Sequence, residues 1–176
     1  GRGDVYKRQQ ILRIGIPIAL QDGFIQIAFI VITVIANRRG LNDAAAVGIV
    51  EKVISALFIV PSSMLATVSA LSAQNIGAGK HERAAKTLKY AIIITSIYGV
   101  FVVLIVQLCT SSVLRMFTSD TMVITLGVQY LKGYIWDTIF AGIHFSFSGY
   151  FAAYGKSYIG FIHNIISVSY THLPSP

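Results

Sequence analysis

The sequence has little charge, and the charge that it has is unbalanced. Charged residues make up 12% of the 176-residue chain, hydrophobic residues make up 55%, and the mean hydropathy is +0.69. A typical soluble domain carries about 25% charged residues. With so few polar side chains, a soluble fold of this size could not cover its own surface. The composition therefore excludes an ordinary water-soluble domain and predicts a membrane protein.

Cysteine is nearly absent, and acidic residues are scarce. Cys109 is the single cysteine, so no disulfide can form within the chain, and a zinc or redox centre would lack ligands. Lys and Arg number 14 against 7 Asp and Glu. The basic residues stand at the ends of apolar runs and form no stripe with interleaved aromatics, so we expect no nucleic-acid partner. The basic excess instead indicates membrane topology.

Long apolar runs dominate what is present. They cover residues 14–37, 44–73, 90–114 and 122–154, and a fifth begins near residue 158. A spanning helix needs about 20 residues, whereas a strand of a membrane barrel needs only about 9–11. The runs predict an all-α, polytopic membrane helix bundle with about four transmembrane helices plus the start of a fifth.

The two ends of the chain do not follow this pattern. Residues 1–9, "GRGDVYKRQ", and residues 168–176, "VSYTHLPSP", resemble translated sequencing-adaptor ends. We interpret both as non-native and leave them out of fold reasoning. Residues 10–167 are then the transmembrane part, and we expect it to begin and end within a longer protein.

Short connections predict that neighbouring helices are antiparallel. Asn42 or Asp43 is placed to cap the second helix, and Asp120 the fourth. The side of the membrane that holds Arg13 also receives most of the other basic residues: Lys80, Arg83, Lys86, Lys89 and Lys156, against Arg38, Arg39, Arg115 and Lys132 on the opposite side. This difference predicts that the Arg13 side faces the cytoplasm.

One connection, "SAQNIGAGKHERAAK" at residues 72–86, invites comparison with a phosphate-binding loop. That motif requires Gly where Gln74 stands and Ser or Thr where His81 stands, and it follows a strand. The nucleotide interpretation fails. Gly77 and Gly79 can instead take positive φ and end a helix. We interpret the segment as a cytoplasmic elbow, with these motif residues: Gln74, Asn75, Gly77, Gly79, Lys80 and Arg83.

The elbow is also the first of three motifs that resemble the MATE family of multidrug and toxic compound extrusion transporters. It resembles the family's Q-N-x-G-A-G-K-x-x-R signature. "GIPIALQDGF" (15–24) resembles G-x-P-x-x-x-Q at the start of a six-helix lobe, and "FSFSGYFAAYGKS" (145–157) resembles the F-x-x-x-G-x-x-R-G-x-G run. Two departures stand out. The R-G pair is replaced by Ala152 and Ala153, and a membrane carboxylate that many members carry is Ala141 here.

This resemblance implies most of one lobe of a two-lobed secondary transporter, and no enzyme. Such a protein lies in a bacterial-type cytoplasmic membrane as a multi-pass integral protein. It exchanges a small organic, often cationic, substrate for Na⁺ or H⁺ and needs no other cofactor. Its partners would be the substrate, membrane lipid and the missing second lobe. One lobe alone is not expected to transport, because alternating access requires an opposing lobe.

Charged side chains within the apolar runs are the candidate site, because an intramembrane charge costs about 2.5–3.5 kcal/mol on insertion scales. We hypothesise that Asp137, near the middle of the fourth run, takes up the coupling ion beside Tyr134 or His144. The other candidates for the ion pathway or substrate cavity are Glu51, Asp22 and Gln26.

Plainer interpretations remain beside this one. Glu51 and Lys52 suit an interfacial pair, Asp22 suits a bond to backbone freed near Pro17, and His144 suits packing. A lipid or lipid-linked sugar flippase of the same superfamily and a non-transporting assembly subunit are the alternative functions. No Ser/His, paired-Asp or metal-ligand constellation converges in these runs, so an intramembrane enzyme is not expected.

Overall fold

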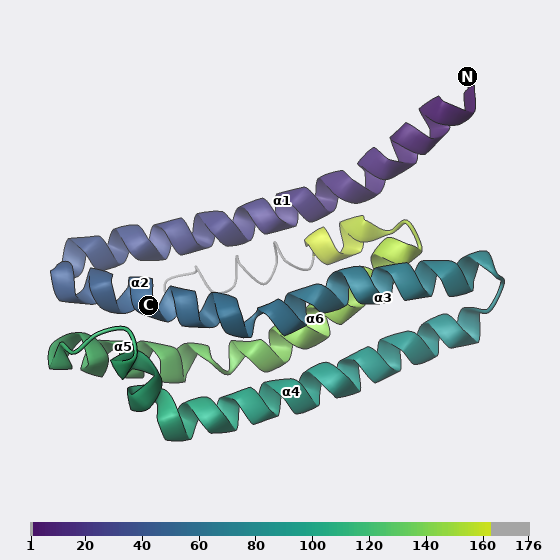
Figure 1. Ribbon diagram of the computed structural model, residues 1–176. Coiled ribbons are helices and arrows are strands. Elements are labelled where there is room, and N and C mark those ends of the chain that lie inside the picture. The colour runs from purple at the N-terminus through teal and green to yellow at the C-terminus, as the bar shows by residue number, and fades with distance from the viewer. Residues whose placement is uncertain (1, 163–176) are drawn as a thin grey trace, which may run out of the picture.

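The computed structural model describes residues 2–162, and their regular structure is entirely helical (Figure 1). The six helices are α1 (Arg2–Arg39), α2 (Leu41–Leu57), α3 (Ile59–Gly77), α4 (His81–Arg115), α5 (Thr121–Tyr134) and α6 (Asp137–Ala153). Helical turns resume at residues 157–162, where the fifth run begins. Three segments are long and apolar enough to cross a membrane: Ile11–Arg39, Leu41–Gly77 and His81–Arg115. The predicted all-α membrane bundle is confirmed.

The expected non-native ends are not distinguished by the structure. Residues 2–9 continue α1 without interruption, and residues 168–176 lie outside the described residues, together with most of the fifth run. The helix also continues through Pro17, so the break that the sequence suggested there does not occur.

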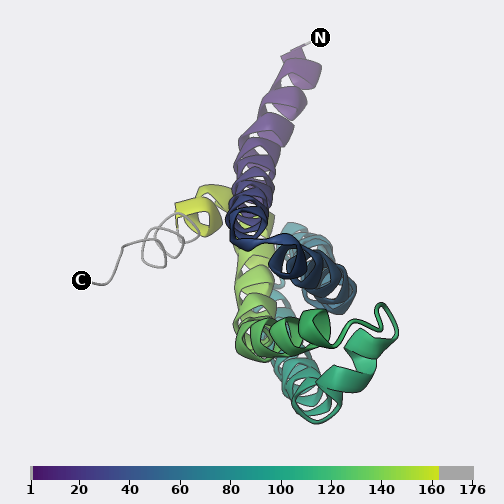
Figure 2. The same ribbon diagram turned by 90° about the vertical axis from the view of Figure 1, so that its left-hand side faces the viewer.

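The chain runs back and forth as the short connections predicted. In Figure 1, α1 lies along one side of the α2–α3 pair, and α4 lies on the other side beyond α5 and α6. The view along the helices shows the α2–α3 pair and the α5–α6 pair side by side, with α1 and α4 at opposite ends of the bundle (Figure 2). The Arg13 segment and the two Lys-containing turns share one end, because Ser157 Oγ donates to the Arg13 carbonyl at 3.3 Å and His81 contacts Tyr154.

The predicted helix caps are confirmed at one position and wrong at another. Asp120 caps α5, and its carboxylate accepts from the amides of Met122 at 2.8 Å and Val123 at 3.3 Å. Neither Asn42 nor Asp43 caps α2, because that helix starts earlier, after Gly40. Gly40 has φ 135°, a conformation that favours glycine and lets α1 turn directly into α2.

Two of the four predicted spans are interrupted. The second is divided at Phe58 into α2 and α3, and the fourth at Ile135 and Trp136 into α5 and α6. The expectation that residues 122–154 form one rod is therefore wrong. Pro61 explains the first interruption, because proline lacks the N–H that would bond to the Leu57 carbonyl. Proline is tolerated in the first turn of a helix, and Pro61 lies in the first turn of α3.

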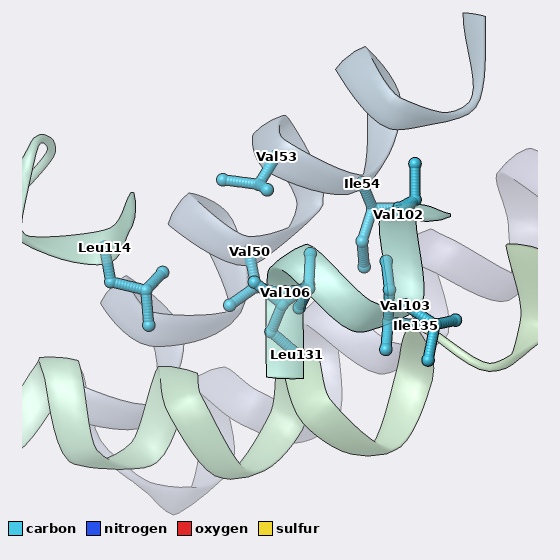
Figure 3. Packing of buried hydrophobic residues seen from close by; sticks show 9 residues of the cluster. All are labelled: Val50, Val53, Ile54, Val102, Val103, Val106, Leu114, Leu131 and Ile135. Carbon is cyan, nitrogen blue, oxygen red and sulfur yellow. The ribbon is translucent and has the colours of Figure 1, made fainter. Parts of the chain in front are cut away.

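The main hydrophobic core lies where α2, α4 and α5 meet. Figure 3 shows its nine buried side chains: Val50, Val53, Ile54, Val102, Val103, Val106, Leu114, Leu131 and Ile135. α4 is packed on one face only. Ile97, Phe101 and Leu108 are exposed, whereas the opposite face is buried. An uncharged helix can have both faces apolar, so the sequence could not show which one is packed.

Small residues allow α6 to approach its neighbours closely. A Cβ placed on Gly142 would lie 2.7 Å from Thr95 Cβ of α4, and one on Gly149 would overlap the Leu65 carbonyl oxygen of α3. Packing through small residues is the usual way for membrane helices to associate, because lipid supplies no hydrophobic drive between them. This seam fixes α6, and therefore the residues at its start.

Candidate functional site

An aromatic cluster lies beside both helix interruptions. Tyr134, the last residue of α5, has ring-centroid distances of 6.4 Å to Phe29 of α1, 6.2 Å to Phe58 and 6.0 Å to Tyr130. Phe58 is the residue that divides α2 from α3. The two interruptions are therefore adjacent in space, although they are far apart in the sequence. Aromatic faces at such a position suit a flat or cationic organic ligand.

Glu51 of α2 belongs to the same region. Thr33 Oγ1 of α1 donates to Glu51 Oε1 at 3.0 Å, and the side chain is half-buried. The charge of Glu51 acts on the hydroxyls of both Tyr130 and Tyr134. Glu51 therefore lies near the aromatic cluster.

Asp137 also lies near this cluster. It is the first residue of α6, and its charge also acts on the Tyr134 hydroxyl. Its side chain is exposed, and within residues 2–162 it has no hydrogen-bond or ion-pair partner. A carboxylate at a helix N-terminus is favoured by the helix dipole. The structure therefore brings together the predicted residues Glu51, Tyr134 and Asp137.

His144 lies elsewhere. Two turns along α6 from Asp137, its Nε2 is 3.0 Å from Nε2 of Gln21 on α1. Gln21 is only 3% exposed, and our site prediction did not include it. The sequence did mark Gln21, because it is the final residue of the G-x-P-x-x-x-Q motif. The contact between Gln21 and His144 joins α1 to α6, two helices that otherwise make few contacts with each other.

The remaining α1 candidates, Asp22 and Gln26, make no hydrogen bond or ring contact with this region within residues 2–162. Asp22 and Gln26 are exposed, and neither has a hydrogen-bond partner within the described chain. Of the α1 side chains that the structure describes, only Gln21 and Ala36 are buried. Across residues 2–162, no three His, Cys, Asp or Glu side chains converge as metal ligands would.

The predicted elbow is formed by a specific C-cap. The amide of Gly79 donates to the Ile76 carbonyl at 2.9 Å, and that of Lys80 donates to the Asn75 carbonyl at 2.8 Å. With Ala78 as the C-cap, this is the Schellman arrangement. Gly79 has φ 73°, as expected, whereas Gly77 is the last residue of α3 and does not have positive φ.

Elsewhere in the elbow, the side-chain Nδ2 of Asn75 donates to the Leu71 carbonyl at 2.7 Å. Gln74, Lys80 and Arg83 are exposed. These residues therefore serve the turn and its surface.

A second turn of the same kind follows α6. Gly155 has φ 69°, its amide donates to the Ala152 carbonyl at 2.9 Å, and the Lys156 amide donates to the Phe151 carbonyl at 2.9 Å. The two turns touch, because His81 Nδ1 lies 3.2 Å from the Tyr154 hydroxyl and the rings stack at 6.1 Å. Ala152 and Ala153 occupy the positions of the missing R-G pair and leave this contact intact.

Long apolar antiparallel helices, some of them interrupted at mid-span beside acidic and aromatic side chains, define a polytopic membrane helix bundle. The comparisons specify the family. The MatE family model matches residues 17–175, which is most of the chain. The chain therefore belongs to the MatE family, as its three motifs predicted.

The curated relatives carry names in keeping with that family. "Probable multidrug resistance protein YoeA" of Bacillus subtilis is 24% identical over 132 residues, which cover 75% of this chain and 28% of that protein. "Probable multidrug resistance protein YpnP" of the same organism is 25% identical, over 89% of this chain and 35% of that protein. Human "Multidrug and toxin extrusion protein 1" is 25% identical, over 93% of this chain and 29% of that protein.

The chain thus spans about a third of the length of the curated relatives that it matches. No solved structure matches it significantly.

Proposed function

We propose that this chain is part of a cation-coupled efflux antiporter that exports small organic, often cationic, compounds in exchange for Na⁺ or H⁺. The observation that carries the proposal is the position of Asp137. It opens α6 at a helix interruption, next to Tyr134 and within electrostatic range of the hydroxyl toward which the charge of Glu51 also acts. Interrupted helices near mid-membrane are where secondary transporters bind ions and substrates.

The chemistry follows from the charges. Two carboxylates attract a cation, and a proton or Na⁺ bound there competes with a cationic substrate for the same negative charge. The aromatic rings of Tyr134, Phe29 and Phe58 supply apolar and cation–π contacts to an organic ion. The acidic character favours export of cations over translocation of an anionic lipid-linked sugar. An ion gradient drives such an exchange, so no nucleotide or metal cofactor enters the proposal.

The proposal also covers location and partners. The chain lies in the cytoplasmic membrane with the elbow at residues 74–83 toward the cytoplasm, in keeping with the basic residues at that end. The exposed faces of α1 meet a second lobe, without which alternating access cannot occur.

Asp137→Asn tests the proposal in the full-length transporter that contains this chain. Efflux of a fluorescent organic cation is measured in vesicles with Na⁺ and pH gradients imposed separately. We expect Asp137→Asn to abolish coupled efflux under whichever gradient drives the normal protein. Asp120→Asn is the matched control, because it neutralises an exposed acidic residue and keeps a helix cap. Unchanged efflux in Asp137→Asn, at equal protein levels, would contradict the proposal.

A further inference from the structure

Both helix interruptions leave backbone carbonyls that need a donor, because the membrane interior has no water to supply one. At the first, the Leu57 carbonyl would accept from residue 61 in a continuous helix, but Pro61 has no N–H. The hydroxyl of Tyr98 donates to this carbonyl at 2.8 Å. Tyr98 belongs to α4 and is half-buried beside the hydrophobic core.

At the second interruption, a side chain of α4 again donates to a backbone carbonyl. In a continuous helix the Lys132 carbonyl would accept from the amide of Trp136. Here Nε2 of Gln107 donates to the Lys132 carbonyl at 3.2 Å, while Thr138 closes a tighter turn on the Ile135 carbonyl at 3.0 Å. Gln107 is also half-buried and also belongs to α4.

The two donors stand out on their helix. Between residues 90 and 114, α4 carries no charge, and its other side chains are mostly aliphatic. Tyr98 and Gln107 are nine residues apart, about 13.5 Å along the helix axis. Each reaches a different interrupted span, and the spans themselves meet where Phe58 contacts Tyr134.

We propose that Tyr98 and Gln107 are positioning residues, and that α4 acts as a two-point staple that holds both interruptions in their observed shape. Among residues 2–162, neither side chain hydrogen-bonds to Glu51 or Asp137. They act through the backbone that carries Phe58, Tyr134 and Asp137. Their importance for transport depends on the proposed function, whereas their effect on the backbone does not.

Hydrogen exchange tests the staple directly in the full-length transporter in lipid nanodiscs. Tyr98→Phe removes only the donor oxygen, and Gln107→Met keeps the side-chain length without a donor. Losing a single interhelical hydrogen bond should speed amide exchange about threefold to twentyfold. We expect this near residues 57–62 for Tyr98→Phe and near residues 132–139 for Gln107→Met. Tyr90→Phe and Gln129→Met alter exposed side chains and are the matched controls.

The localisation of the effect decides the outcome. Faster exchange confined to the facing interruption supports the staple, and exchange no faster than in the controls, or raised evenly along the chain, overturns it. Transport adds a second readout. The half-saturating concentration of the coupling ion should rise in Tyr98→Phe and Gln107→Met at equal protein levels. If Asp137→Asn leaves efflux intact while local exchange still rises, the proposed function fails and the staple stands.

Discussion

Replacing Gly149 with alanine tests the closest helix contact in the structure. A methyl group there would overlap the Leu65 carbonyl oxygen and lie 3.2 Å from both the Leu65 carbonyl carbon and the Ser69 amide nitrogen. These are backbone atoms, so no side-chain rotation can relieve the overlap. α3 and α6 would have to separate along the seam shown behind α3 in Figure 1.

The size of the effect follows from two opposing terms. Overpacking a tight contact costs about 1–3 kcal/mol, and replacing glycine by alanine within a helix returns up to about 1 kcal/mol. We therefore expect Gly149→Ala to lower the free energy of unfolding by about 1–2 kcal/mol, a factor of roughly 5–30 in the folded to unfolded ratio. Gly48→Ala is the matched control, because nothing lies within 4 Å of its added methyl. That control should be neutral or slightly stabilising.

Unfolding by SDS titration in lipid–detergent bicelles, followed by circular dichroism, measures the difference. The midpoint of Gly149→Ala should fall below both the unmodified protein and Gly48→Ala. If the two variants share one midpoint, α3 and α6 do not approach as closely as described, and the seam that fixes the start of α6 is refuted.

Three further predictions follow from local geometry. Gly79→Ala should destabilise the elbow by about 1 kcal/mol, because alanine resists φ 73°, whereas Gly77→Ala should not; thermal unfolding of the two variants checks this. Asp120→Ala should cost about 0.5–2 kcal/mol of stability in the same assay, and Asp120→Asn should restore it. Thr33→Val removes the donor to Glu51 and should change the half-saturating ion concentration about threefold to tenfold, with Thr33→Ser as the rescue; an unchanged value would place Glu51 outside the ion pathway.

Several features of the site were predictable because they are local. Asp137 was a candidate because a charge within a long apolar run is costly wherever the run packs. Gly79 was expected at positive φ because the glycine spacing and the following basic residues mark a helix end. Asp120 was expected to cap α5 for a similar reason.

Other features depended on contacts that no local pattern reveals. The sequence placed Asp137 near the middle of one rod, but the helix ends at Tyr134 and starts again at Asp137. Nothing at these positions resembles a proline break. Gln21 was visible in a motif, yet its pairing with His144 required knowing that α1 crosses α6 at that level.

Hydropathy and glycine spacing were enough to predict an all-α membrane bundle, the antiparallel order of its helices and the turn at Gly79. These properties follow from transfer to lipid and from backbone sterics, which each segment experiences separately. The meeting of the two interruptions, the donors from Tyr98 and Gln107, and the approach of Glu51 and Asp137 to Tyr134 arose only from packing. They are set by which faces of otherwise apolar helices come together, and this depends on small residues and hydrogen bonds between segments far apart in the chain.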